Sequence, residues 1–538
     1  MQVEAVRTTG IYCRADCSAQ PLPHNVTHYS NPVAAEVAGF RPCLRCHPER
    51  RAGSLADLDV PTPVGAALLR INDGFLDHHD EEALAAHVGY SARQLRRLFE
   101  HHVGATPTTI ARSRRAHFAR CLIDDTDLTF AEIARAAGFG GPRQLHRAIT
   151  SVFCFTPTEL RSKRRRGERP RLDGGLVLAL PYLAPFDFEA FISHQASRAI
   201  PGVEAVTGAG GSAAYVRSFS AYGHAGIVEV TAPTDSAPMA AVPTDAAPMA
   251  AVPTDAAPMA AVPTDAAPMA AVPGDGEQLQ MRLHLPTYDS IIDAVSRARA
   301  LLGTDTNPSP AAAALADDPL IGPLTRSAPG LRVPRSWDRF ETAIRIVVGQ
   351  QISLAAASTL SGRIAQRFGT PIDALLECCA GSPARIEHGE DVAVPLTHLF
   401  PDAAKLADAG TAGLAGLGFT QRRIDTIVGI SRAVASGDVD LSATDTLEAT
   451  VAQLCELPGI GPWTAHLIAM RVFGHDDAFP ASDLGLRRAI ERLVDHPMQP
   501  REIDTLAERW RPYRAWAAQH LWHAAAGSGP TQSGPTPR

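Results

Sequence analysis

The chain of 538 residues is 45% hydrophobic and 20% charged, with a formal net charge of −7. This length predicts several domains with sizeable cores, and the absence of a run of about 18 apolar residues argues against a transmembrane helix. The first residues lack the apolar core of a signal peptide, so we expect a cytoplasmic protein with no membrane partner. The charge is uneven, because residues 91–171 hold 17 Lys and Arg against 7 Asp and Glu, a balance typical of a nucleic-acid-binding segment.

Two closely spaced cysteine pairs lie near the start of the chain. Three residues separate Cys13 from Cys17, two separate Cys43 from Cys46, and 25 residues lie between the pairs. This layout is typical of one zinc ion held by four thiolates. The alternative is four unrelated thiols, but the other five of the nine cysteines show no such pairing, and an odd number does not suit a complete disulfide framework.

The residues around these cysteines extend the pattern to Arg7-Thr8-Thr9-Gly10-Ile11-Tyr12-Cys13-Arg14 and to Ala38-Gly39-Phe40-Arg41-Pro42-Cys43 followed by Arg45-Cys46. This pattern resembles the N-terminal zinc domain of the bacterial Ada family. The resemblance implies that Cys13 accepts a methyl group from a DNA methylphosphotriester, and that Cys17, Cys43 and Cys46 are permanent ligands. Only six residues precede Arg7, fewer than in this family, so we predict an N-terminally short domain over residues 1–55.

Two helix-turn-helix patterns follow. In residues 81–99 apolar side chains recur at helical spacing, Gly89 interrupts them, and Ser91 can cap the second helix. Residues 130–149 repeat this pattern. Each second helix carries Arg and Gln, which can read guanine and adenine in the major groove; the candidates are Arg93, Gln94, Arg96, Arg143 and Gln144. A plain helical bundle with a solvated basic face is the alternative.

The duplicated unit, the joining helix near residues 107–122 and the ending Phe155-Thr156-Pro157-Thr158-Glu159-Leu160-Arg161 resemble AraC-type DNA-binding domains. We therefore predict such a domain over residues 65–162, followed by a basic linker over 163–175. The resemblance implies binding to double-stranded promoter DNA and contact with RNA polymerase.

A small mixed α/β segment is predicted over residues 176–290. It contains candidate strands at 215–219, 226–230 and 279–285 and a candidate helix at 188–197, and it resembles the small subdomain that leads bacterial 3-methyladenine glycosylases of the AlkA type. Four copies of a ten-residue unit occupy residues 233–272. Two prolines in each copy predict a disordered expansion of a hairpin loop, across which the flanking strands can still pair.

Helical patterns dominate residues 291–525, and residues 526–538 are predicted to be a disordered tail. The stretch Leu457-Pro458-Gly459-Ile460-Gly461-Pro462-Trp463-Thr464-Ala465 places a Gly-x-Gly turn between two helices, where free N–H groups at a helix start can bind an anion. An ordinary corner between helices is the alternative. Asp483 follows in Phe479-Pro480-Ala481-Ser482-Asp483-Leu484, at a predicted helix start.

Together these two segments resemble the helix-hairpin-helix DNA glycosylases. The resemblance implies that Gly459 and Gly461 hold a DNA phosphate, that a monovalent cation binds the hairpin carbonyls, and that Asp483 drives base excision. The stretch Phe340–Ser353 resembles the first core helix and minor-groove turn of this family. Gln351 is then the candidate wedge beside a flipped base, with Gln350 next to it, and a simple capped turn is the alternative.

Trp463 and Tyr513 match positions of the aromatic base pocket in this family, and aromatic rings suit an electron-poor alkylated base. His194, Leu467 and Leu484 stand at positions where the best-known relative carries aromatic residues. Relatives that also cut the DNA strand carry a lysine where Trp463 stands, so we predict a monofunctional glycosylase. The chain also lacks the later cysteines that would hold the iron–sulfur cluster of some relatives.

The predicted fold is multidomain and mainly α, with a small four-cysteine zinc domain, an AraC-type double helix-turn-helix, a small α/β subdomain and an all-α helix-hairpin-helix glycosylase domain. The implied function is bifunctional: excision of alkylated purines in the manner of DNA-3-methyladenine glycosylase II, and methyl acceptance at Cys13 with activation of alkylation-response genes. The Pro-Cys-His-Arg motif for direct repair of guanine O6 does not occur. Two alternatives remain, a transcription factor with an inactive glycosylase fold, or a glycosylase whose front half targets DNA without sensing methylation.

Overall fold

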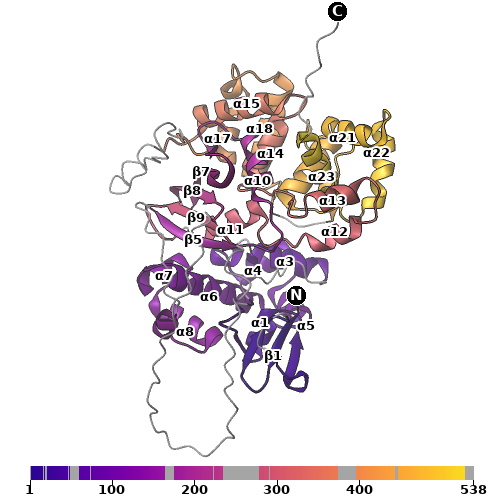
Figure 1. Ribbon diagram of the computed structural model, residues 1–538. Helices are drawn as coiled ribbons and strands as arrows, with labels where there is room; N and C mark the ends of the chain where they lie inside the picture. Colours follow the sequence, from indigo (N-terminus) through magenta and orange to yellow (C-terminus); the bar gives the residue numbers. More distant parts are fainter. Residues whose placement is uncertain are drawn as a thin grey trace, which may run out of the picture.

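The computed structural model describes residues 2–15, 17, 21–46, 48, 60–72, 74–163, 175–221, 223–233, 278–289, 291–372, 396–442 and 446–527. Most of the predicted linker, repeat and tail therefore lies outside the described residues. The described chain is mainly helical with two small sheets, as predicted (Figure 1). No helix among these residues is long and apolar enough to cross a membrane.

A four-stranded sheet and one helix form the N-terminal unit. The strands, in the order β3-β1-β2-β4, are β1 (Val3–Val6), β2 (Ile11–Cys13), β3 (Val26–Tyr29) and β4 (Arg41–Pro42), and the helix is α1 (Pro32–Val37). Asn31 caps α1 by accepting the Ala34 N–H at 2.9 Å, and its buried side-chain amide donates to the Val103 carbonyl at 2.8 Å. The cap therefore also attaches this unit to the helices that follow.

Seven helices form the two helix-turn-helix units. They are α3 (Thr62–Asn72), α4 (Glu81–His87), α5 (Ala92–His102), α6 (Pro107–Asp125), α7 (Phe130–Ala136), α8 (Pro142–Phe153) and α9 (Pro157–Lys163). Ser91 caps α5 in a capping box with Gln94, and Thr129 caps α7 in the same way with Glu132. These reciprocal hydrogen bonds satisfy N–H groups that a helix start leaves unpaired. The predicted cap at Ser91 is confirmed, whereas the cap at Thr129 was not predicted.

The second sheet is antiparallel throughout, in the order β5-β9-β8-β7-β6. Its strands are β5 (Leu176–Pro181), β6 (Glu204–Thr207), β7 (Ala214–Ala221), β8 (His224–Thr231) and β9 (Gln278–His284), and it is accompanied by α10 (Phe188–Ala196) and α11 (Ile291–Leu302). Strands β8 and β9 pair across the repeat, from Ile227 opposite His284 to Thr231 opposite Gln280. The pairing of the flanking strands is therefore confirmed, and β5 and β6 are strands that the sequence analysis did not indicate.

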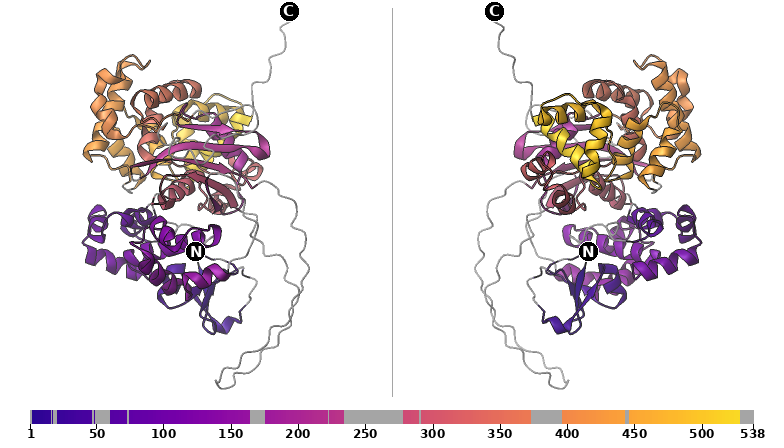
Figure 2. Two further views of the ribbon diagram at one scale, coloured as in Figure 1. Left: turned by 90° about the vertical axis from the view of Figure 1, so that its left-hand side faces the viewer. Right: turned by 90° about the vertical axis from the view of Figure 1, so that its right-hand side faces the viewer.

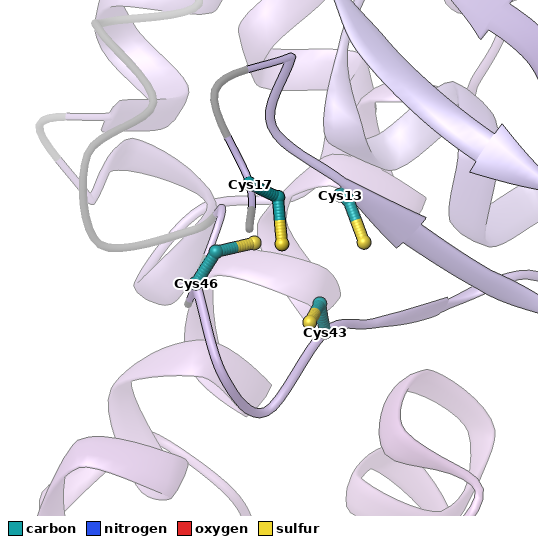
Figure 3. Close-up of side chains that lie close together, drawn as sticks. All are labelled: Cys13, Cys17, Cys43 and Cys46. Carbon is teal, nitrogen blue, oxygen red and sulfur yellow. The ribbon is translucent and has the colours of Figure 1, made fainter. Parts of the chain in front are cut away.

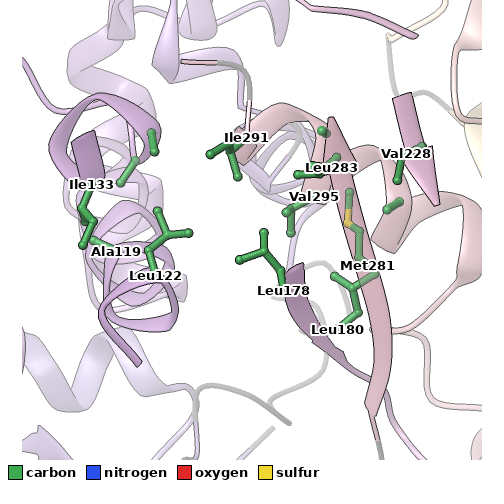
Figure 4. Packing of buried hydrophobic residues seen from close by; sticks show 14 of the residues in the cluster. Ala119, Leu122, Ile133, Leu178, Leu180, Val228, Met281, Leu283, Ile291 and Val295 are labelled. Carbon is green, nitrogen blue, oxygen red and sulfur yellow. The ribbon is translucent and has the colours of Figure 1, made fainter. Parts of the chain in front are cut away.

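One hydrophobic cluster joins the helix-turn-helix region to the second sheet. It includes Leu122 of α6 and Ile133 of α7 on one side, and Leu178 of β5 and Val295 of α11 on the other. Figure 4 shows these side chains facing each other between the two regions. Helix α11 contributes Ile291 and Val295 to this cluster and therefore packs with the sheet. The predicted domain border at residue 290, just before α11, stays a prediction.

Two groups of helices complete the chain and pack around two further cores. The helices are α12 (Ser309–Leu315), α13 (Ile321–Ser327), α14 (Arg339–Val348), α15 (Leu354–Phe368), α17 (Ala403–Leu414), α18 (Gln421–Ser436), α19 (Leu447–Cys455), α20 (Pro462–Ile468), the π-helical turn η6 (Ala469–Phe473), α21 (Leu484–Val494), α22 (Pro500–Ala507) and α23 (Arg514–Gly527). Short 3-10 turns occur at η1 (Pro23–Asn25), η3 (Phe75–Asp77), η4 (Gly210–Ser212) and η7 (Glu508–Trp510). Both side views in Figure 2 show these helices grouped around the second sheet, with the helix-turn-helix region below them.

A polar contact also links the front half of the chain (residues 2–163, the zinc unit and helix-turn-helix region) to the back half (residues 175–527). The guanidinium of Arg70, 3% exposed, lies 2.7 Å from a carboxylate oxygen of Asp440 and donates to the Ser442 hydroxyl at 2.7 Å. Burial of the Asp440 carboxyl opposes its ionisation, but hydrogen bonds from Ser442 and Arg70 outweigh burial and lower its pKa from 3.8 to about 2. The ionised carboxylate is therefore the form that holds the two halves together.

We predict that Asp440→Asn destabilises the contact between the halves by about 1 kcal/mol, a value reduced because the Asp440 side chain is 37% exposed. Because the folded pKa is depressed, this stabilisation is complete above about pH 4 and is lost as the pH falls toward 2. Urea unfolding of the whole chain at pH 7 and at pH 3 measures both effects. Asp408→Asn, at an exposed position of α17, is the matched control, and an equal loss in both variants would contradict the prediction.

Candidate functional site

The four predicted cysteine ligands converge on one point. Cys13 ends β2, Cys17 lies in the following loop, and Cys43 and Cys46 follow β4. Their sulfur atoms all lie within 4.8 Å of one another, and Figure 3 shows the four side chains directed toward a common centre. Cys13, Cys17 and Cys43 are buried.

The thiols cannot all ionise without a cation. Hydrogen bonds to Cys43 and Cys46, together with burial, raise the pKa of Cys13 far above its ordinary value, while hydrogen bonding with Cys13 lowers the pKa of Cys43 far below it. Without a metal, the Cys43 thiolate therefore accepts hydrogen bonds from neighbouring thiols, and Cys13 keeps its proton. Four convergent sulfur donors fit a tetrahedral zinc ion, which takes thiolate ligands at about 2.3 Å.

The zinc unit contacts the helix-turn-helix region through one carboxylate. The Tyr12 hydroxyl, next to Cys13, donates to Glu36 of α1 at 2.9 Å, and the Ser113 hydroxyl of α6 donates to its other oxygen at 2.6 Å. The His117 ring, also on α6, lies 2.6 Å from Glu36 and packs edge-on against Phe153 of α8. The four-cysteine site is therefore connected to α8 through Tyr12, Glu36 and His117.

The candidate recognition helices expose the predicted side chains. Arg93, Gln94, Arg96, Arg143 and Gln144 are all exposed on α5 and α8. Three of them also have local contacts: Gln94 belongs to the capping box of α5, Gln144 accepts the Gly140 N–H at 2.9 Å, and Arg96 forms an ion pair with Glu81 at 2.7 Å. DNA reading by Arg96 and the glutamines would therefore exchange these contacts for base or phosphate contacts.

The two glutamines in the turn between α14 and α15 have different surroundings. Gln350 points inward and donates to the Gly459 carbonyl at 3.1 Å and to the Thr464 hydroxyl at 3.0 Å. Gln351 is exposed and has a left-handed backbone with φ of 57°, a strained conformation that is typical of functional positions. The structure thus brings Gln350 to the hairpin and leaves Gln351 projecting from the turn.

The hairpin itself depends on Gly459. Its φ is 89°, and a Cβ there would lie 1.8 Å from the Thr426 hydroxyl of α18, so no other residue fits without displacing α18. Among the described residues, the N–H groups of Gly459 and Gly461 have no hydrogen-bond acceptor. Two free donors beside the start of α20 are suited to an anion.

Asp483 is held by two tryptophans. It caps α21 by accepting the Leu486 N–H at 2.9 Å, and its two carboxylate oxygens accept the indole N–H groups of Trp463 and Trp522, each at 3.0 Å. Trp463 was a predicted pocket residue, and the structure places it directly on the carboxylate. Trp522 was not predicted, because it lies 39 residues later on α23 and no local spacing relates it to Asp483.

The other predicted pocket residues lie in different settings. Tyr513 is half-buried just before α23 and packs against the core of the C-terminal helices. Leu467 is half-buried on α20, and Leu484 is 47% exposed at the start of α21. His194 is half-buried on α10, where burial and then the charges of Arg198 and Arg471 hold its pKa well below 6.5, so the imidazole is neutral at pH 7.

Two guanidinium groups lie near Asp483 that the sequence analysis did not indicate. Arg471 in η6 has its guanidinium carbon 5.4 Å from the centre of the Trp522 ring, and the charge of Asp483 acts on Arg198 at the end of α10. Burial, with the neighbouring Arg198, lowers the pKa of Arg471 to about 9, and burial with Arg345 lowers that of Arg198 to about 10. Both groups therefore remain cationic at neutral pH.

Four protein families match successive parts of the chain. They are the metal binding domain of Ada (residues 2–49), a helix-turn-helix domain (84–163), the AlkA N-terminal domain (177–257 and 259–338) and the HhH-GPD superfamily base excision DNA repair protein (344–514).

Three relatives show how these parts are combined elsewhere. The chain is 36% identical over 524 residues to the "Probable bifunctional transcriptional activator/DNA repair enzyme AlkA" of Mycobacterium tuberculosis, covering 97% of this chain and 92% of that protein. It is 29% identical over 203 residues to DNA-3-methyladenine glycosylase 2 of Escherichia coli (38% of this chain, 64% of that protein). It is 35% identical over 160 residues to the bifunctional transcriptional activator/DNA repair enzyme Ada of Escherichia coli (30% and 44%).

We predict that the purified chain carries one zinc ion and that Cys46→Ser weakens its binding by more than about 100-fold, because losing a residue that merely orients a ligand already costs about 10- to 100-fold. Removing the ion with a chelator should unfold the N-terminal unit, since metal binding and folding are coupled in small zinc domains. Elemental analysis and circular dichroism measure the two effects. Cys455→Ser, at an exposed thiol on α19, should keep its zinc; equal loss from both variants would exclude the four-cysteine site.

Proposed function

The chain belongs to the AlkA-type family of bifunctional transcriptional activators and DNA repair enzymes, and from this premise we propose that its back half excises alkylated bases while its front half senses DNA methylation. The observation that carries the first activity is the carboxylate of Asp483, held by the indole N–H groups of Trp463 and Trp522 at 3.0 Å in the segment that follows the hairpin. The reaction is hydrolysis of the N-glycosidic bond of an alkylated purine, as in DNA-3-methyladenine glycosylase II.

In this proposal Asp483 stabilises positive charge on the sugar. The bond between C1′ and the base nitrogen breaks, its electron pair leaves with the base, and the carboxylate faces the cation that develops at C1′. Water then adds to C1′ and loses its proton to the carboxylate or to solvent. Trp463, at the position where strand-cutting relatives carry a lysine, has no amine to form a Schiff base, so the abasic product is released without strand cleavage.

The hairpin and the α14–α15 turn would hold the DNA. The N–H groups of Gly459 and Gly461 would donate to a phosphate, and the hairpin carbonyls would hold a monovalent cation, whose charge would add to this attraction. Gln351 enters the gap left by the flipped nucleotide, while Gln350 keeps the turn attached to the hairpin through the Gly459 carbonyl. Tyr513 would complete the stacking surface of the base pocket.

In the front half, a zinc ion on Cys13, Cys17, Cys43 and Cys46 would keep the thiols ionised. The Cys13 sulfur attacks the methyl carbon of a phosphotriester; the S–C bond forms, the C–O bond breaks, and its electron pair stays on the phosphate oxygen. Methylation removes one negative charge from the site, which reduces its repulsion of the DNA backbone and so favours DNA binding. The methylated protein then reads promoter DNA through Arg93, Arg143 and their neighbours on α5 and α8, and activates RNA polymerase in the cytoplasm.

Asp483→Asn is predicted to lower the single-turnover rate of 3-methyladenine release by at least about 1000-fold. Trp522→Phe keeps the ring but removes one N–H donor, and is expected to slow release by about 10- to 100-fold. High-performance liquid chromatography of bases released from methylated DNA measures both rates. Trp516→Phe, which removes an N–H donor to Asp476 instead, is the matched control; a wild-type chain that releases no base would refute the enzyme assignment.

Cys13 is expected to gain a single methyl group, an increase of about 14 Da, when the zinc-loaded chain is incubated with DNA that contains methylphosphotriesters. Peptide mass spectrometry locates the methyl group. Cys13→Ser should remain unmodified, and Cys121→Ser, a change on α6 outside the cluster, should react as the wild type does. An unmodified Cys13 in the zinc-loaded wild type would remove the sensing role and leave the glycosylase role intact.

A further inference from the structure

Arg471 spans the space between three parts of the back half. It lies in the π-helical turn η6 that continues α20, and such turns often occur at functional sites. Its guanidinium donates to the Pro334 carbonyl before α14 at 3.0 Å and to the Gln519 side chain of α23 at 2.9 Å. One face of the group lies over the ring of Trp522, one turn further along α23. Trp522 in turn donates to Asp483, so the arginine is one aromatic ring away from the carboxylate.

In the described part of the chain, no carboxylate pairs directly with Arg471. Among the described residues, neither Arg471 nor Arg198 forms an ion pair. Burial and then the charge of Arg198 lower the pKa of Arg471, while burial and then the charge of Arg345 lower that of Arg198. A purely structural arginine looks different in this protein. Arg332 is buried and donates to five backbone carbonyls, those of Gly303, Gly330, Leu331, Leu183 and Pro185. Arg471 has two hydrogen-bond acceptors among the described residues and lies over the ring of Trp522, so its charge is one aromatic ring away from Asp483.

Such a charge acts oppositely on two classes of damaged base. A purine alkylated at a ring nitrogen is already cationic in DNA, so a nearby guanidinium repels it. An uncharged damaged base must leave with a negative charge developing on its ring, and a preorganised cation stabilises that charge. The neutral imidazole of His194 beside the two arginines adds no competing positive charge.

We propose that Arg471, supported by Arg198, is a specificity-determining residue that shifts the base pocket toward damaged bases that carry no positive charge. This inference rests on the proposed glycosylase activity and names its substrate class more closely. Arg471 acts through its charge and through the ring of Trp522, and the two contributions can be separated, because lysine keeps the charge and loses the planar stacking group.

The experiment compares two DNA duplexes of one sequence in single-turnover assays, one with 7-methylguanine, which is cationic, and one with hypoxanthine, which is uncharged. The measured quantity is the ratio of the two release rates relative to that of the wild-type full-length chain. Arg471→Gln is expected to lower the ratio of uncharged to cationic release by about tenfold. Arg471→Lys should slow both reactions but keep the ratio within about twofold.

Arg367→Gln is the matched control, because Arg367 is exposed and lies 5.9 Å over the ring of Phe368 on α15; it should leave both rates unchanged. Arg198→Gln should lower the ratio in the same direction, which keeps the inference testable if Arg471→Gln does not fold. Equal slowing of both substrates in folded Arg471→Gln or Arg198→Gln would overturn the inference while leaving the glycosylase function intact. If the wild type releases neither base, the proposed function itself fails.

Discussion

A buried network of two carboxylates and two guanidinium groups determines how the back half is assembled. Arg217 of β7 lies 2.7 Å from Glu341 of α14, and Arg345 of the same helix lies 2.7 Å from Glu204 of β6. Both carboxylates and Arg217 are almost fully buried. Moving such charges out of water costs several kcal/mol each, and removing one member leaves its partner uncompensated. The four charges therefore allow one position of α14 on the sheet and penalise any other.

That position of α14 locates the parts of the candidate active site. Arg345 also donates to the Arg198 carbonyl at 2.7 Å, so the helix holds the end of α10, where His194 and Arg198 lie. Its last turn leads to Gln350, which contacts the carbonyl of Gly459. The sheet, the turn and the hairpin are thus aligned by one helix, although they come from distant parts of the chain.

The two halves are also one packed body. Apolar side chains of α6 and α7 share a core with β5, β9 and α11, and Arg70 contacts Asp440 across the same border. The zinc unit is attached to α6 through Glu36. Since large shared cores resist relative motion, the four-cysteine site, helices α5 and α8 and the Asp483 site are held in defined positions relative to one another.

The sequence by itself determined what depends on short-range patterns: the four-cysteine site, the capped helix at Ser91, the Gly-x-Gly hairpin and the helix start at Asp483. These features depend on spacings of a few residues, which are visible along the chain. Only the tertiary structure decided which side chains surround Asp483. Trp522 comes from a helix 39 residues away, and Arg471 reaches the same ring from η6. Such contacts depend on which helices pack against each other. Hydrophobic periodicity marks the buried face of a helix but not the helix that it meets.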